Sequence, residues 1–194
     1  MTIKHALSET WKFLKKDTWQ SWIVSIILII IGIKWVFFPI DSLITGALLP
    51  LVVIESCSMY HNTGFDNWWK DNAAWYESQG ITKAEFENFP FENGLNKGDI
   101  IFVWGKGAYK QGDVIIFNAP TQYPIIHRLS STSPLSTKGD NGFTNPGRLP
   151  NGLEENIAQE KVIGKAVGRI PFLGWVKLIF FEPSRAPSAR GLCK

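Results

Sequence analysis

The stretch Glu55–Met59 carries two serines, Ser56 and Ser58, on either side of a cysteine and directly after a β-branched run. A serine hydroxyl is a weak nucleophile until a neighbouring base takes its proton, so a base is needed elsewhere in the chain. His127 lies alone in an apolar run, and its imidazole suits general-base work near neutral pH. Asp140 follows in a tight turn and offers a carboxylate to orient the imidazole. The order serine, histidine, aspartate is one on which a catalytic triad can be built, although chance order is common.

Short β-branched runs are expected to position these side chains as strands. One of them, Leu51–Ile54, leads into the serine pair. The segments Gly98–Val103 and Gly112–Phe117 resemble each other, because each is a Gly-Asp turn dipeptide followed by β-branched and aromatic residues. This pattern is typical of a buried strand opened by a turn. The further strand candidates are Ile125–Leu129, Leu135–Lys138 and Lys161–Arg169. We therefore predict a mostly β body.

An apolar segment, Trp22–Ile40, precedes this body. A spanning helix needs roughly 20 mostly apolar residues, and this segment just qualifies, with Lys34 as its single charge. Trp19 and Trp22 lie at one edge and Trp35 at the other, where indoles favour the membrane interface. A cleavable signal peptide is the alternative, but no small-x-small cleavage site follows cleanly. We expect one retained transmembrane helix.

The formal net charge of +3 is unevenly distributed. Residues 1–21 sum to +2, residues 22–160 to −5 and residues 161–194 to +6. Basic ends beside apolar segments indicate a membrane surface, whereas the total is too small to suggest nucleic-acid binding. The positive-inside rule then predicts single-pass insertion in the cell membrane, with the catalytic domain on the extracytoplasmic side. The expected parts are a cytoplasmic N-terminus (1–21), a transmembrane anchor (22–40), an extracytoplasmic β domain (41–182) and a flexible tail (183–194).

Residues 62–96 differ from the rest of the body, because tryptophan and phenylalanine are interspersed with polar and acidic groups. A helix capped by Asp66 and running through Gln79 is predicted, and Thr82–Glu85 fits a capping box. We expect a helical insertion. Its aromatic side chains can either dip into the membrane interface or pack over the β body, and the sequence leaves both open.

Near the C-terminus, Ile170–Phe181 is apolar but too short to span a membrane. It can lie on the outer leaflet, with Lys177 and Arg185 near the headgroups, act as a second shallow anchor, or form a packed terminal strand. The chain has two cysteines, Cys57 and Cys193. They can pair if the fold brings them together, and otherwise Cys57 is a small apolar residue.

Several ordered motifs make the chain resemble a known family. They are Ser56-x-Ser58-Met59, the two Gly-Asp strands, Ile126-His127-Arg128, Thr137-Lys138-Gly139-Asp140-Asn141 and Gly164-x-Ala166-x-Gly168-Arg169-Ile170-Pro171-x-x-Gly174. Their order, over roughly residues 40–174, is that of type I signal peptidases. A histidine in this context resembles the archaeal and endoplasmic-reticulum branch, in which it replaces the lysine of bacterial members. The resemblance implies a membrane-anchored serine endopeptidase that removes signal peptides after small residues, without a cofactor or metal.

Matched by position, the resemblance implies that Ser58 is the nucleophile and His127 the general base. Ser56, together with the backbone N–H of Ser58, is implied to form the oxyanion hole. His61 is a departure, since the family usually has proline two residues after the methionine. We expect His61 to be an exposed turn residue.

The acid of the triad is less directly implied. The family commonly has acidic residues both in the Gly-Asp-Asn turn and a few residues beyond it. Here the later positions read Asn145 and Pro146, so the resemblance leaves Asp140 as the predicted acid. Glu154 and Glu155 are remote substitutes.

Alternatives remain open at this stage. Asp140 can be a structural turn residue, and Lys138 can be the base of a Ser–Lys variant. The missing later acid also fits an inactive membrane-anchored subunit, and a serine protease for another class of membrane precursor is a further alternative. The implied partners are signal-peptide-bearing preproteins and membrane lipid, with the protein export machinery as a further candidate and no nucleic acid.

Overall fold

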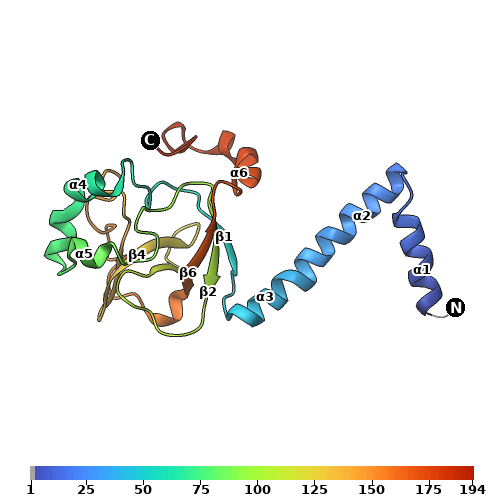
Figure 1. Cartoon of the computed structure of the whole chain (residues 1–194), viewed down its shortest axis with the longest axis horizontal. Helices are drawn as coiled ribbons and strands as arrows, with labels where there is room; N and C mark the ends of the chain where they lie inside the picture. The colour runs from blue at the N-terminus through green and yellow to red at the C-terminus, as the bar shows by residue number, and fades with distance from the viewer. Residues whose placement is uncertain (1–2) are drawn as a thin grey trace. The chain divides into compact units, whose positions relative to one another are not determined.

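The computed structural model describes residues 3–194, which divide after Ile44 into two compact units (Figure 1). The first unit is helical. Its elements are α1 (Ile3–Leu14), α2 (Trp19–Gly32), a π-helical turn η1 (Ile33–Phe37) and α3 (Phe38–Thr45), the last residue of which begins the second unit. From Trp19 to Thr45 the helix runs on for 27 residues, and within residues 3–194 it is the one helix long and apolar enough to cross a membrane.

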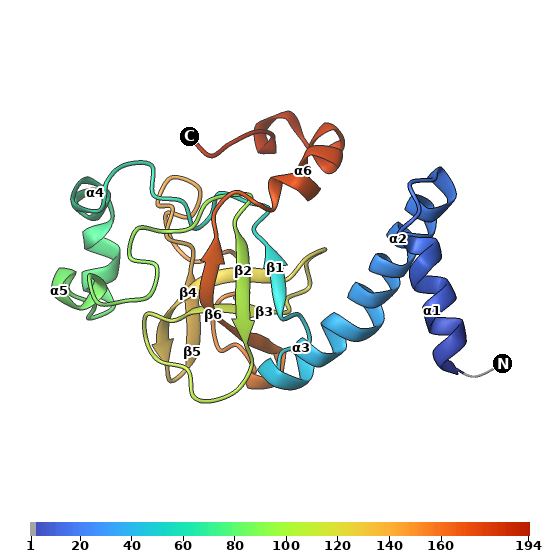
Figure 2. The same ribbon diagram turned by 45° about the vertical axis from the view of Figure 1, so that its right-hand side comes forward.

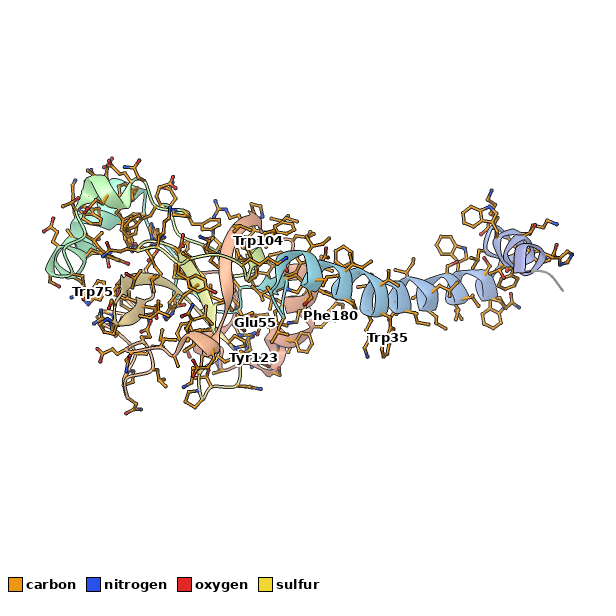
Figure 3. All side chains as sticks on the ribbon, turned by 90° about the horizontal axis from the view of Figure 1, so that it is seen from below. Trp35, Glu55, Trp75, Trp104, Tyr123 and Phe180 are labelled. Carbon is orange, nitrogen blue, oxygen red and sulfur yellow. A yellow bond between two sulfur atoms is a disulfide. The ribbon has the colours of Figure 1, made fainter. Side chains whose placement is uncertain are left out.

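This helix contains the predicted anchor, Trp22–Ile40, and extends it at both ends. Its apolar side chains project outward from the ribbon, as Trp35 does in Figure 3. Because the helix continues to Thr45, Lys34 lies nearer its middle than the shorter predicted segment implied. The Lys34 ammonium group lies 5.7 Å from the centroid of the Trp35 ring. A single N-terminal apolar helix of this kind suggests single-pass membrane anchoring.

The second unit is built on a six-stranded antiparallel sheet in the order β1-β2-β6-β3-β4-β5 (Figure 2). The strands are β1 (Leu51–Val53), β2 (Ile100–Trp104), β3 (Val114–Phe117), β4 (Ile125–Thr132), β5 (Leu135–Lys138) and β6 (Val162–Ile170). All six lie where strands were predicted. The β core is therefore confirmed, but helical segments hold about 37% of the chain, so "mostly β" describes only the centre of this unit.

The two Gly-Asp segments fold alike, as their sequence similarity predicted. Gly98 and Gly112 both have φ +90°, a left-handed conformation that favours glycine. The carboxylates of Asp99 and Asp113 each accept a backbone N–H from three residues earlier, at 2.9 Å. The strands that follow, β2 and β3, flank β6 on its two sides. A Cβ on Gly112 would lie 2.3 Å from the Phe89 ring, so this turn also receives part of the insertion.

The insertion forms two helices, α4 (Phe65–Ser78) and α5 (Lys83–Phe86), as predicted. The capping box of Thr82 and Glu85 is confirmed, whereas α4 begins after Gly64 and Asp66 pairs with Lys83 instead of capping it. Of the two interpretations of its aromatic residues, packing is observed. A buried cluster is formed by Trp68, Trp69, Tyr76, Ile81 and Phe86. Both helices lie beside the β4–β5 edge of the sheet (Figures 1 and 2).

The C-terminal segment differs from its prediction. The chain leaves β6 at Ile170 and forms helix α6 (Trp175–Phe181), so the packed terminal strand is wrong. Two short 3₁₀ turns follow, η3 (Glu182–Ser184) and η4 (Pro187–Ala189), and a third, η2 (Gln159–Lys161), precedes β6. The predicted flexible tail is instead folded, because a disulfide joins Cys193 to Cys57. Neither cysteine is therefore free, and Cys57 is not simply a small apolar residue.

Candidate active site

The two serines lie on a turn that begins where β1 ends. Met59 anchors the turn, because its side chain is 1% exposed within the main core and its carbonyl accepts the N–H of Leu95 at 2.8 Å. Burying Met59 leaves Ser58 half-buried and Ser56 exposed. The two hydroxyl oxygens are 3.2 Å apart, within hydrogen-bond distance. The two hydroxyls predicted as nucleophile and oxyanion-hole donor therefore lie next to each other.

A second segment holds this turn from the side. The backbone N–H of Asn141 donates to the carbonyl of Ser58 at 2.8 Å. The amide side chain of Asn141 donates to the carbonyl of Cys57 at 2.9 Å. The Gly139–Asn141 turn is thus joined to the serine turn by two hydrogen bonds, both donated by Asn141.

His127 lies in the middle of β4, opposite Ile115 of β3, and is 3% exposed. Its Nδ1 is hydrogen-bonded to the carboxylate of Glu154. A carboxylate can only accept, so Nδ1 carries the proton and Nε2 is left as the acceptor. A Cβ built on Gly139 would lie 2.9 Å from His127 Nε2 and 2.8 Å from the Ser58 carbonyl oxygen. His127 Nε2 and the Ser58 carbonyl oxygen therefore lie close together, next to the position that a Gly139 Cβ would take.

The carboxylate that contacts His127 is therefore that of Glu154, one of the two predicted substitutes, whereas Asp140, the predicted acid, contacts other side chains. Glu154 is fully buried, in the segment between β5 and β6. The Thr137 hydroxyl donates to the same carboxylate oxygen as His127, at 3.1 Å, and the backbone N–H of Leu149 donates to the other. Thr137 also donates its backbone N–H to the Glu154 carbonyl at 2.9 Å. These bonds fix the carboxylate against the imidazole.

Asp140 has another role, which its neighbours explain. Successive strand residues point to opposite faces, so Arg128 leaves β4 on the face opposite His127. Arg128 donates to both carboxylate oxygens of Asp140, through Nε at 3.0 Å and Nη2 at 2.7 Å, and the Tyr76 hydroxyl donates at 2.9 Å. Burial acts to raise the pKa of Asp140, but Arg128 and His61 outweigh it and hold that pKa well below its usual range. Asp140 thus remains ionised and fastens the turn that carries Gly139.

The helical insertion supports the same turn. His61 is 7% exposed, so the expected exposed turn residue is wrong. Its ring stacks on Trp68 with centroids 3.7 Å apart, and its Nε2 lies 3.2 Å from Asp140 Oδ2. The Trp68 indole donates to the Asp140 carbonyl at 3.1 Å. The aromatic residues of the insertion therefore pack against the back of the candidate site.

Lys138 is buried beside this turn. Its ammonium group donates to the Gly139 carbonyl at 2.8 Å and lies 5.0 Å and 5.3 Å from the ring centroids of Trp75 and Tyr76. Burial lowers the pKa of Lys138 to about 8, against the opposing effect of the two nearby carboxylates. These contacts use the amine within its own turn, and they lend no support to a Ser–Lys variant.

The chain is similar to known proteins over about half of its length. No family model matches the chain. It is 31% identical over 101 residues to the signal peptidase complex catalytic subunit sec11 of Sclerotinia sclerotiorum, which covers 47% of this chain and 59% of that relative. The protein of the same name from Pyrenophora tritici-repentis is 35% identical over 101 residues, covering 47% and 58%. The chain therefore spans less than two thirds of the length of these curated relatives. The similarity to the endoplasmic-reticulum branch of the type I signal peptidases, predicted from the ordered motifs, is confirmed by the names of these homologues.

Proposed function

We propose that this protein is a membrane-bound serine endopeptidase that removes signal peptides from exported preproteins by cleavage after small residues. The observation that carries the proposal is the buried pair of His127 and Glu154, whose free imidazole nitrogen faces the turn of Ser58 across Gly139. The names of the curated relatives support signal peptides as the substrate class. The pair supplies the base that a serine nucleophile requires.

In this mechanism His127 Nε2 accepts the proton of the Ser58 hydroxyl while Oγ attacks the scissile carbonyl carbon. Glu154 holds the imidazole in the tautomer that can accept, and its negative charge stabilises the imidazolium that forms. The imidazolium then gives its proton to the leaving amine as the C–N bond breaks. A water molecule, deprotonated by the same nitrogen, hydrolyses the acyl-enzyme and regenerates Ser58.

The oxyanion of the tetrahedral intermediate needs donors beside Ser58. We assign them to the Ser58 backbone N–H and the Ser56 hydroxyl, which lies 3.2 Å from the Ser58 hydroxyl. Removing one donor of such a pair typically costs about 10²–10³-fold in kcat. Asp140 and Asn141 act here as positioning residues, because they hold the Gly139 turn and the carbonyls of the serine turn.

The proposed location is a membrane, with the Trp19–Thr45 helix as a single-pass anchor and the second unit on the extracytoplasmic side. The second unit also exposes an apolar surface on and before α6, formed by Phe172, Leu173, Val176, Ile179, Phe180 and Phe181. Phe180, marked in Figure 3, is 79% exposed. Lys177 lies on the same short helix and can reach lipid headgroups. We assign this surface to contact with the outer leaflet.

The test of the catalytic proposal is cleavage of a model preprotein by the detergent-solubilised chain. The intact chain is expected to cut after a small residue, and Ser58→Ala and His127→Ala are expected to be inert. Glu155→Gln serves as a control, because Glu155 is exposed and pairs with Arg148 at 3.5 Å, away from His127. If the intact chain and both serine and histidine variants behave alike, the proposal fails and an inactive membrane-anchored subunit takes its place.

A further inference from the structure

The C-terminal segment returns to the serine turn at the residue between the two serines. Cys57, flanked by Ser56 and Ser58, is disulfide-bonded to Cys193, 136 residues later in the chain, with Cα atoms 5.6 Å apart. We call the segment Glu182–Cys193 the C-terminal strap. Figures 1 and 2 both show the C-terminal coil lying on the side of the sheet where β1 ends.

The strap and α6 also hold the residue before the serines. Arg185 Nη1 donates to the backbone carbonyl of Glu55 at 2.9 Å, and Arg185 Nη2 pairs with the Glu55 carboxylate. Lys177 of α6 donates to the same carboxylate at 3.0 Å. Glu55 is labelled in Figure 3. Ser56 therefore lies between two residues that the C-terminal segment holds, Glu55 and Cys57.

The strap is itself fixed to the body of the domain. Lys97, 1% exposed, pairs with Glu182 at 2.7 Å and donates to the Ala189 carbonyl, also at 2.7 Å. Within the strap, the N–H of Gly191 donates to the Glu182 carboxylate at 2.6 Å, and Arg190 Nε donates to the Arg185 carbonyl at 2.8 Å. The strap is therefore fixed around the buried Lys97, and it can hold the serine turn that it contacts in position.

The serine turn is thus held from two directions. Asn141 holds the carbonyls of Cys57 and Ser58, while the strap holds Glu55 and the sulfur of Cys57. Catalysis by positioned groups is sensitive to small displacements, since an error of about 1 Å can cost about 10²-fold in rate. The two hydroxyls that need this accuracy are those of Ser56 and Ser58, 3.2 Å apart.

We propose that the C-terminal strap is a positioning element for the serine turn, with Cys193 acting through the disulfide and Arg185 acting through Glu55. Its catalytic consequence rests on the proposed peptidase function, whereas its structural consequence does not. Losing a cross-link that only stabilised the fold would lower the melting temperature and leave kcat unchanged well below that temperature. Losing a positioning element lowers kcat while KM stays nearly constant, because substrate binding does not depend on the serine hydroxyls.

The experiment compares the full chain in detergent with Cys193→Ser, Arg185→Gln and Arg185→Lys, at a temperature well below unfolding. Cys193→Ser breaks the cross-link without substituting a residue of the serine turn, and Arg185→Gln breaks the ion pair while keeping the cross-link. Lys83→Gln is the matched control, because it removes an exposed ion pair with Asp66 far from the strap in sequence. Each variant is measured by hydrogen exchange of residues 55–60 and by kcat and KM on a preprotein.

Cys193→Ser is expected to speed exchange at the Tyr60 N–H, which donates to the Cys57 carbonyl at 3.1 Å, and to lower kcat about 10-fold or more. Arg185→Gln is expected to act in the same direction and Arg185→Lys to recover part of the loss, since lysine keeps one charged donor. A small dithiol should reproduce the cysteine variant in the intact chain. It passes two electrons and two protons to the disulfide, giving two thiols, and is itself oxidised to a disulfide.

Unchanged exchange of residues 55–60 in Cys193→Ser and Arg185→Gln would overturn the proposal, whatever the activity. Faster exchange with an unchanged kcat would overturn its catalytic half. If the intact chain cleaves no preprotein but exchange still rises in both variants, the peptidase function has failed and the structural role of the strap is supported. A dithiol effect on Cys193→Ser equal to that on the intact chain would also count against the proposal, because that variant has no cross-link to reduce.

Discussion

Replacing Glu154 with glutamine tests whether Glu154, which contacts His127, orients the imidazole in place of Asp140, the acid that the motif predicted. The side chains have nearly the same shape, but the glutamine amide has one acceptor and one donor end where the carboxylate has two acceptors. Three donors converge on Glu154, from His127, Thr137 and Leu149. Either orientation of the amide therefore opposes an NH₂ group to at least one of them. If the amide NH₂ group faces His127, it donates to Nδ1 and favours the other imidazole tautomer, with the proton on Nε2.

The size of the effect follows from that tautomer. An imidazole protonated on Nε2 cannot accept the Ser58 proton, and the negative charge that stabilises the imidazolium is also lost. The comparable change of a triad aspartate to asparagine in another serine protease costs about 10⁴-fold in kcat. We expect roughly 10³–10⁴-fold here, equivalent to about 4–6 kcal/mol in the activation free energy. A buried donor without an acceptor should also lower the free energy of unfolding by about 1–3 kcal/mol.

The assay is single-turnover cleavage of a preprotein by the detergent-solubilised chain, at a temperature well below the melting point of each variant. Glu155→Gln is the matched control and should retain the rate of the intact chain, since that carboxylate is exposed and pairs only with Arg148 in the described interactions. A Glu154→Gln rate within tenfold of the intact chain would refute the assignment of Glu154. A larger loss of cleavage rate in a variant that has unfolded would not test the assignment, so the melting temperature is recorded for each variant.

Three further changes test neighbouring parts of the site. Gly139→Ala would place a methyl group 2.9 Å from His127 Nε2 and 2.8 Å from the Ser58 carbonyl oxygen, so single-turnover rates should fall by about 10²-fold or more and the melting temperature should fall as well, and a rate equal to that of the intact chain would contradict the site geometry. Burial opposes ionisation of Asp140, but Arg128 lowers its pKa well below 3.8, so stability should be lost as pH falls below about 3.8 in the intact chain, and Asp140→Asn should lack this acid loss. Burial lowers the pKa of Lys138 from 10.5 to about 8, and the unfolded chain therefore binds more protons between these values, so stability to urea should rise from pH 8 to pH 10. Lys138→Met should remove that rise, and parallel curves for the two proteins would contradict it.

The strands were predictable because their signal is local. Each strand of the sheet coincides with a segment predicted to be a strand, and in both Gly-Asp turns the aspartate carboxylate accepts an N–H from three residues earlier. The capping box at Thr82 is local in the same sense. Burial of the aromatic residues of the insertion was not predictable, since a tryptophan-rich helix can cover a sheet or enter a membrane interface with the same sequence pattern.

From the sequence, the contact of Glu154 with His127 and the pairing of the two cysteines were only possibilities, because their signal is a contact between distant residues. Glu154 reaches His127 across 27 residues and has no motif around it, and Cys193 reaches Cys57 across 136. One local feature of the sequence does indicate which acid orients His127. His127 and Arg128 are neighbours on a strand and so point to opposite faces, and a carboxylate that neutralises a buried Arg128 is on the wrong face to orient His127.

The contact between His127 and Glu154 also bears on the acidic residue that the family commonly has beyond the Gly-Asp-Asn turn. The sequence suggested an inactive subunit because Asn145 and Pro146 stand where the family commonly has an acid. The imidazole of His127, however, requires only a buried acceptor at its Nδ1, and the chain between β5 and β6 can supply it from any position that reaches this nitrogen. Glu154 does so with one more methylene than aspartate and with two further donors to hold it. The absence of a carboxylate at 145 and 146 is therefore no argument against a working serine–histidine pair, and the Glu154→Gln rate measures that directly.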